Sequence, residues 1–236
     1  IAANHVCAAQ IVRMLEEYGL DDLDDLADEI ITRSEKSIRA SIAKAPAGVY
    51  RSEGVIEQVE GQPEVLIRCA VTIQGSDITV DLTGSSLQVE WGGNVVYNFT
   101  YAYVHMAVKS IFDPEIPNND GIAAPIRLIA PEGTVVNCRH PAAVAARMQI
   151  GHFITEIIYR ALARALPDRV VAAGGGTPAT MQMFYGRHGD GRPFHTVLIR
   201  GGGLGASATR DGEGSFIFPA NGANTPVEIL ESDSPL

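Results

Sequence analysis

The amino-acid sequence predicts a mixed α/β fold, and three observations support this class. Apolar residues recur with a helical period over residues 2–45 and 141–166, and with a period of two over residues 49–82. Glycine is concentrated late in the chain, where thirteen of the 24 glycines lie between Gly174 and Gly222. These patterns predict an N-terminal αα-hairpin, a β-hairpin region, and then mixed helices and strands with glycine-rich loops.

Two helices are predicted first, over residues 2–18 and from Asp21 to about Ala45. The first should bury a stripe formed by Cys7, Ile11, Met14, Leu15 and Tyr18. The second should bury Leu23, Leu26, Ile30, Ser34, Ile38 and Ile42. Its acidic residues cluster in the first turns and its basic residues in the later ones, which complements the helix dipole. The acidic run is therefore interpreted as a solvated helix face rather than as a docking or metal-binding patch.

Strands and further helices follow in order along the chain. Strands are predicted over residues 49–59, 65–73 and 77–82, with a tight turn at residues 74–77. A helix over residues 100–112 precedes strands at residues 126–130 and 134–137. A long helix from Pro141 to Leu166 is ended by Pro167, and short strands are predicted at residues 180–185, 195–200 and 215–218.

We divide the chain into a helical hairpin (1–48), a β-rich segment (49–86) and a mixed α/β segment (87–236). These are expected to be parts of one larger subunit. The sequence opens without Met, on a helical pattern that is already running, which suggests a cut through a longer protein.

Composition excludes several classes of partner. Eighteen basic and 28 acidic side chains give 18 − 28 = −10, which argues against a nucleic-acid or anionic-membrane ligand. No apolar run reaches the ~18 residues of a membrane span. Three widely spaced cysteines do not suggest a disulfide framework, so a reducing cytoplasm is the expected location. The low charged fraction of 19% suggests that another chain covers part of the surface.

A glycine-rich stretch at residues 201–206 satisfies the GxGxxG/A pattern of dinucleotide-binding loops. The residues that follow, 207–214, do not read as a helix, which a dinucleotide site requires. Two interpretations remain: a tight turn packed on another surface, or a backbone nest that faces a substrate or phosphate.

Gln149, His152 and Glu156 form one polar stripe on the long helix, opposite its aliphatic face. The spacing of His152 and Glu156 allows a hydrogen-bonded pair that would orient a general base. Ordinary pairing on an exposed helix face is the alternative.

Two groups of residues have the chemistry of metal ligands. His188, Asp190 and His195 lie on a glycine-rich hairpin and could hold a divalent cation, although turns of this kind recruit polar residues anyway. Cys138 and His140 could share a face, but no second pair lies nearby.

Several stretches, taken in order, resemble one family. Residues 81–89 (DLTGSSLQV), 113–121 (DPEIPNNDG), 129–133 (IAPEG), 202–206 (GGLGA) and 221–231 (NGANTPVEILE) follow the pattern of the hydantoinase B/5-oxoprolinase family. Each match is weak alone, but their order and spacing are specific. The resemblance covers nearly the whole chain.

The resemblance implies part of the B subunit of an ATP-dependent cyclic-amide hydrolase. A hydantoinase A-type partner would bind ATP and phosphorylate the substrate's carbonyl oxygen. The family's divalent metal is held by His and Asp residues of an N-terminal half, so no metal ligand is assigned here. A ketone carboxylase subunit is a second hypothesis, and a scaffold or subunit-interaction segment without catalytic residues is a third.

The resemblance also suggests site residues. His152 would act as a base, and Gly202, Gly203 and Gly205 would supply backbone donors. A polar clamp would consist of Asn221, Asn224 and Glu228, unless these residues only form a rigid turn.

The sequence departs from many members of the family at Arg147 and at Arg200. These arginines could bind a carboxylate or phosphate, or form surface ion pairs.

Overall fold

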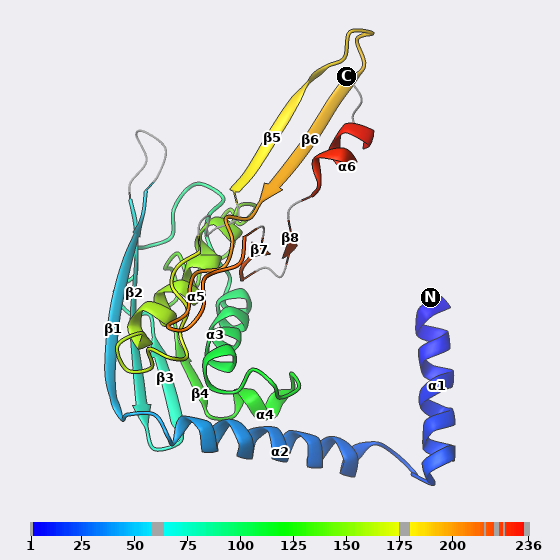
Figure 1. The fold of residues 1–236 in the computed structure, drawn as a ribbon, viewed down its shortest axis with the longest axis vertical. Helices are drawn as coiled ribbons and strands as arrows, with labels where there is room; N and C mark the ends of the chain where they lie inside the picture. The colour runs from blue at the N-terminus through cyan, green and yellow to red at the C-terminus, as the bar shows by residue number, and fades with distance from the viewer. Residues whose placement is uncertain are drawn as a thin grey trace.

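The main body of the protein is a four-stranded mixed sheet with helices on one face (Figure 1). The computed structural model describes residues 2–57, 64–174, 180–214, 216–219, 222–223 and 225–233. The strand order is β1-β2-β3-β4, in which the first three strands are antiparallel and β4 runs parallel to β3. The strands are β1 (Gly48–Ile56), β2 (Val65–Gln74), β3 (Asp77–Asp81) and β4 (Ile126–Ile129). The predicted mixed α/β class is confirmed.

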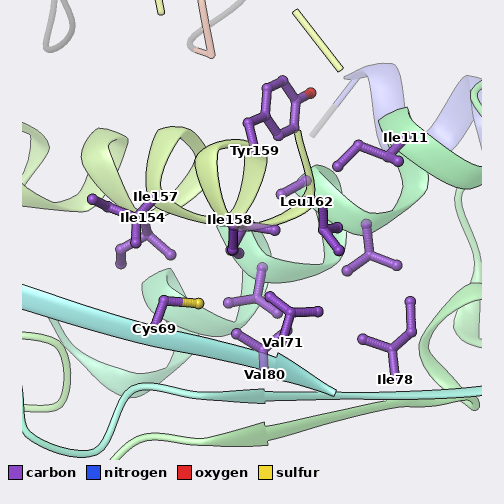
Figure 2. Close-up of a cluster of buried hydrophobic side chains, with 14 of the residues drawn as sticks. Cys69, Val71, Ile78, Val80, Ile111, Ile154, Ile157, Ile158, Tyr159 and Leu162 are labelled. Atoms are coloured by element: carbon purple, nitrogen blue, oxygen red, sulfur yellow. The ribbon is translucent and has the colours of Figure 1, made fainter. Parts of the chain in front are cut away.

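The alternation of apolar residues determines which face of the sheet is covered. On β2, every second side chain from Val65 to Ile73 is buried, and Ile78 and Val80 continue the same face on β3. Two helices, α3 (Tyr97–Phe112) and α5 (Met148–Leu162), pack on it. Figure 2 shows the aliphatic side chains of α5 directed at this face of the sheet. One cluster of buried apolar side chains extends from Ile38 to Val170. The predicted division of the chain into segments 1–48, 49–86 and 87–236 stays a prediction.

The parallel pairing of β3 with β4 requires a crossover, and α3 with α4 (Asp120–Ala123) provides it. Asn119 caps α4, since its side chain accepts a hydrogen bond from the Gly121 amide at 3.0 Å. The Asn119 amide group also donates to the Ser34 hydroxyl of α2 (Asp24–Ile42) at 2.8 Å. The stretch at residues 113–121 therefore attaches the crossover to α2.

The first helices form as predicted, but their apolar stripes are not buried as predicted. No residue of α1 (Ala2–Tyr18) is buried, and the side chains of Leu26 and Ile30 on α2 are more than 40% exposed. Only Ser34, Ile38 and Ile42 of the predicted α2 set are buried. The reason is geometric: α1 and the start of α2 project beyond the sheet, so no described segment covers them (Figure 1).

The long helix is shorter than predicted because the residues before it bond to another loop. The buried Asn94 side chain donates to the Ala143 carbonyl at 2.9 Å, and the Ala146 amide donates to Gly92 at 2.8 Å. These bonds replace helical ones, so α5 begins at Met148 instead of Pro141, and it ends at Leu162 instead of Leu166.

The predicted strand at residues 134–137 is also wrong. Thr134 forms isolated bridges to Leu87 and to Asn137, and the Gly133 amide donates to the Asn137 carbonyl at 2.8 Å. The chain therefore folds back on itself within these residues.

The C-terminal part contains two small antiparallel pairs. β5 (Thr180–Arg187) and β6 (Pro193–Arg200) form a hairpin that extends from the body, while β7 (Phe216–Ile217) pairs with β8 (Gly222–Ala223). The short helices α4 and α6 (Val227–Asp233) were not predicted. Among the described helices, none combines the length and the apolar character needed to cross a bilayer.

Substituting Gly121→Ala should destabilise the fold by about 3 kcal/mol. A Cβ there would overlap the Ile31 carbonyl oxygen of α2 and lie 2.9 Å from the Glu35 amide nitrogen. The free energy of unfolding in urea measures the effect. Gly189→Ala is the control, because a Cβ at that position meets nothing within 4 Å. Equal stability of the two variants would contradict the packing of α4 on α2.

Candidate functional site

A cavity of about 200 Å³ lies beside α5. One wall is the face of α5 that carries Tyr159, which points away from the sheet in Figure 2. The opposite wall consists of residues 170–174 and of Phe218 and Pro219. The complete lining is His152, Thr155, Glu156, Tyr159, Arg160, Ala163, Val170, Val171, Ala172, Ala173, Gly174, Phe218 and Pro219.

His152 contributes a buried imidazole to this cavity. The residue is 2% exposed, and neither ring nitrogen has a hydrogen-bond partner among the described residues. Its ring lies 5.4 Å from that of Tyr103, centroid to centroid. Burial lowers the pKa of His152, which keeps the ring neutral at pH 7, with one nitrogen as donor and the other as acceptor.

Thr155 lies one helical turn from His152 and lines the same cavity. Its side chain is fully buried, and the hydroxyl has no partner within the described part of the chain. Threonines in helices commonly bond to a carbonyl of the preceding turn, and Thr155 does not. His152 and Thr155 therefore bring three buried polar atoms without a described hydrogen-bond partner close to one small cavity, and each unpaired atom costs about 1–3 kcal/mol.

Glu156 and Arg160 are the charged residues of the wall, and they pair with each other. The closest carboxylate and guanidinium atoms are 3.4 Å apart, and Arg160 also donates to the Glu53 carbonyl of β1 at 3.0 Å. Burial raises the pKa of Glu156, and the positive charge of Arg160 partly offsets this effect. The hydrogen bond between His152 and Glu156 that their spacing allows is not formed. Of the three residues of the predicted polar stripe, His152 is buried, Glu156 is half-buried and Gln149 is exposed.

Tyr159 closes the cavity on its apolar side. Its hydroxyl lies 2.6 Å from that of Ser110 on α3, and its ring lies 5.8 Å from that of Phe218. Burial raises the pKa of Tyr159, so its hydroxyl stays protonated at neutral pH.

The glycine loop at residues 201–206 supports the cavity wall from behind. The Ala172 amide donates to the Ala206 carbonyl at 2.8 Å, and a Cβ at Gly205 would overlap the Ala172 carbonyl. A Cβ at Gly174 would lie 2.5 Å from the Gly203 carbonyl oxygen. Glycine is needed here because two backbone segments approach closely.

The backbone donors suggested for this loop are not directed into the cavity. The Gly203 amide donates to the Phe216 carbonyl at 3.1 Å, Gly202 is exposed, and none of the three glycines lines the cavity. Of the predicted site residues, His152 lines the cavity, while Glu228 lies exposed on α6 and does not. Asn221 and Asn224 lie outside the described residues.

The other sequence candidates lie elsewhere. The Arg147 guanidinium lies over the Phe99 ring at 5.8 Å and is not part of the lining, and the Arg200 side chain is outside the described part. Asp190 pairs with Arg192 at 2.6 Å. No group of three His, Cys, Asp or Glu residues within the described ranges could hold a metal ion.

Sequence reasoning missed Thr155, Tyr159 and Phe218. Thr155 could have been found, because it lies three residues after His152 and hence on the same helix face. Nothing in the local sequence signals Phe218, which reaches the cavity from a distant segment.

Substituting Thr155→Val should stabilise the ligand-free protein by about 1 kcal/mol. Valine has a similar shape and removes an unpaired buried hydroxyl. Thermal or urea unfolding measures the difference, and Thr155→Ser, which retains the hydroxyl, is the control. A clear loss of stability in Thr155→Val would show that the hydroxyl has a partner in the protein.

Comparison with known proteins places the chain in a family. A family model described as hydantoinase B/oxoprolinase matches residues 1–236. The putative D-/L-hydantoinase B subunit of Pseudomonas sp. (strain NS671) is 30% identical over 249 residues, which cover 100% of this chain and 42% of that protein. The beta subunit of the caprolactamase of Pseudomonas jessenii is 23% identical, with 96% and 40% covered.

Solved structures share the fold. The crystal structure of ATP-dependent caprolactamase from Pseudomonas jessenii matches with a TM-score of 0.84 at 22% identity, over 98% of this chain and 41% of that one. Nucleotide-free acetone carboxylase matches with a TM-score of 0.70 at 20% identity, over 84% and 29%. The chain thus spans about two fifths of the length of the two curated relatives from Pseudomonas. Because the family model matches the entire sequence, the chain belongs to the hydantoinase B/oxoprolinase family.

Proposed function

We propose that this chain is part of the B subunit of an ATP-dependent cyclic-amide hydrolase. Two similar proteins are named as subunits of a hydantoinase and of a caprolactamase, which supports both the reaction class and a hetero-oligomer. The single observation that carries the proposal is the cavity beside α5, whose lining includes His152 and Thr155 with buried polar atoms that have no described hydrogen-bond partner. A hydantoinase A-type subunit is the proposed partner, and it would bind ATP and phosphorylate the amide oxygen.

His152 is the proposed base. A neutral, buried imidazole can take a proton from water as the water adds to the former carbonyl carbon of the phosphorylated amide. The imidazolium then returns the proton to the ring nitrogen, and the C–N bond breaks. A second water hydrolyses the resulting acyl phosphate to a carboxylate and phosphate, so that one amide, one ATP and two waters give an amino acid, ADP and phosphate.

The divalent metal of the family does not fit the cavity. The lining offers one imidazole and one carboxylate, and that carboxylate is paired with Arg160. Metal sites in proteins usually take three or more side-chain ligands. We therefore assign no metal to these residues.

Substituting His152→Gln should lower kcat by about a hundredfold or more, because an amide cannot act as a general base at neutral pH. The assay is ring opening and ADP release by the complete B subunit with its A-type partner, using hydantoin, caprolactam and 5-oxoproline in turn. His105→Gln is the matched control, since His105 is a half-buried histidine outside the cavity. Full activity of His152→Gln would exclude the role as a base.

The same assay separates the alternative functions. Turnover that requires bicarbonate would support the ketone carboxylase hypothesis and contradict the hydrolase hypothesis. Unchanged turnover together with altered assembly in the His152 variant would favour a scaffold role.

The pH dependence of kcat/KM should show an acid limb below pH 6.5. His152 is active as a base only when neutral, and burial lowers its pKa below the ordinary value of 6.5, which extends activity to lower pH. Steady-state kinetics between pH 4.5 and 8 measure the limb. In His152→Gln the remaining activity should lose this limb. A limb that persists unchanged in the variant would assign the titration to another group.

A further inference from the structure

Arg160 carries the only positive charge in the described lining of the cavity beside α5. Under the proposed function a phosphorylated amide occupies this cavity, and its phosphoryl group is an anion that a guanidinium binds well. Resting on that function, we propose that Arg160 binds the phosphoryl group of the activated substrate and releases Glu156 in exchange. Arg160 would thereby select the phosphorylated amide over the unphosphorylated one.

The guanidinium of Arg160 is accessible and has donors to spare. Its side chain is 55% exposed. With the described residues it makes two contacts, a hydrogen bond to the Glu53 carbonyl at 3.0 Å and the ion pair with Glu156 at 3.4 Å. A guanidinium has five N–H donors, so 5 − 2 = 3 remain. A phosphoryl group can accept two parallel hydrogen bonds from one guanidinium, which is the common geometry of arginine with phosphate.

The ion pair between Arg160 and Glu156 is looser than a comparable pair in the same protein. Glu35 and Arg39 on α2 have the same spacing of four residues, and their closest atoms are 2.7 Å apart, against 3.4 Å in the cavity wall. The hydrogen bond to the Glu53 carbonyl engages one side of the Arg160 guanidinium. Because a doubly charged phosphoryl group attracts a guanidinium more strongly than a single carboxylate does, the exchange of partners favours the ligand.

The released Glu156 carboxylate does not have to repel the ligand. The side chain is 15% exposed, and burial raises the pKa of Glu156, an effect that Arg160 partly offsets. A second anion nearby raises the pKa of a carboxyl further, so Glu156 takes up a proton more readily once the phosphoryl group has replaced it. The other titratable side chains of the lining are His152 and Tyr159, and the wall opposite α5 has none. A protonated Glu156 can donate a hydrogen bond to a phosphoryl oxygen.

The position of Arg160 on α5 suits this role. Side chains of a helix lean toward its N-terminus, and the guanidinium of Arg160 accordingly lies beside Glu156, one helical turn from the proposed base His152. A phosphoryl group bound there leaves the ring of the substrate against the apolar wall of valine, alanine, glycine, phenylalanine and proline. An unphosphorylated amide offers no charge to Arg160, so the cavity should retain the activated form.

The test measures binding of phenylphosphonate, which joins a small apolar ring to a phosphoryl-like anion. Calorimetry with the complete B subunit, without ATP or the partner subunit, makes the result independent of turnover. Arg160→Gln should weaken binding at least about tenfold, because charge-assisted hydrogen bonds are lost. Arg160→Lys keeps the charge but not the paired donors and should recover part of the loss.

Arg164→Gln is the matched control for these variants. Arg164 is an exposed arginine one turn further along the chain and outside the cavity lining, so its replacement should leave the affinity unchanged. Equal affinity of the Arg160→Gln variant and the unaltered protein would overturn the inference, as would no binding of phenylphosphonate to the unaltered protein.

A second variant acts in the opposite direction. Glu156→Gln removes the carboxylate that competes for Arg160 and should strengthen phenylphosphonate binding about tenfold. A folding defect would weaken binding, so a gain in affinity separates a direct effect on the site from damage to the structure. Unchanged or weaker binding would contradict the exchange of partners.

The outcomes distinguish this inference from the proposed function. Turnover of cyclic amides that is unchanged in Arg160→Gln would overturn the inference and leave the hydrolase proposal intact. Binding of phenylphosphonate that depends on Arg160, without ATP-dependent ring opening of any cyclic amide, would support the phosphoryl site and overturn the hydrolase proposal.

Discussion

The structure depends on α5 being buried on both of its sides. One side, with Ile154, Ile158 and Leu162, packs on the sheet (Figure 2), and the other lines the cavity. Because successive residues of a helix are separated by a constant rotation, the register that places Ile154 and Ile158 in the core also places His152 and Thr155 in the cavity. A rotation of α5 would move both sets together. Core packing therefore positions the polar groups of the site.

Contacts with β1 fix the rotation of α5 about its own axis. The Ser52 hydroxyl donates to the Ile157 carbonyl at 2.6 Å, and Arg160 donates to the neighbouring Glu53 carbonyl. A side chain at Gly54 would meet Ile157 Cδ1 at 2.5 Å, so α5 lies close to the strand backbone. Close backbone approach also explains the glycine loop behind the cavity, where Gly205 lies against Ala172. Gly54, Gly174 and Gly205 therefore allow close approach of neighbouring segments, while ligand contact by Gly202, Gly203 and Gly205 stays a prediction.

Much of the fold could be predicted because its elements are locally encoded. Strands β1 to β4 were found from alternation, and α1, α2 and α3 from helical periodicity, since burial on one face leaves a pattern in the sequence. The errors have a common cause. Residues 141–147 have a helical pattern but bond to the loop at residues 92–94, and α1 has an apolar stripe that no described segment covers. Local patterns contain no information about such partners.

The sequence alone determined the mixed α/β class, the order of most elements, the family and His152 as a candidate. These follow from local periodicity and from motifs that are contiguous in the chain. Only the tertiary structure decided that His152 and Thr155 share a cavity, that Glu156 pairs with Arg160 instead of His152, and that residues 170–174 and Phe218 complete the wall. The physical reason is that burial and hydrogen-bond pairing depend on which distant segments pack together, and this packing is a property of the whole fold.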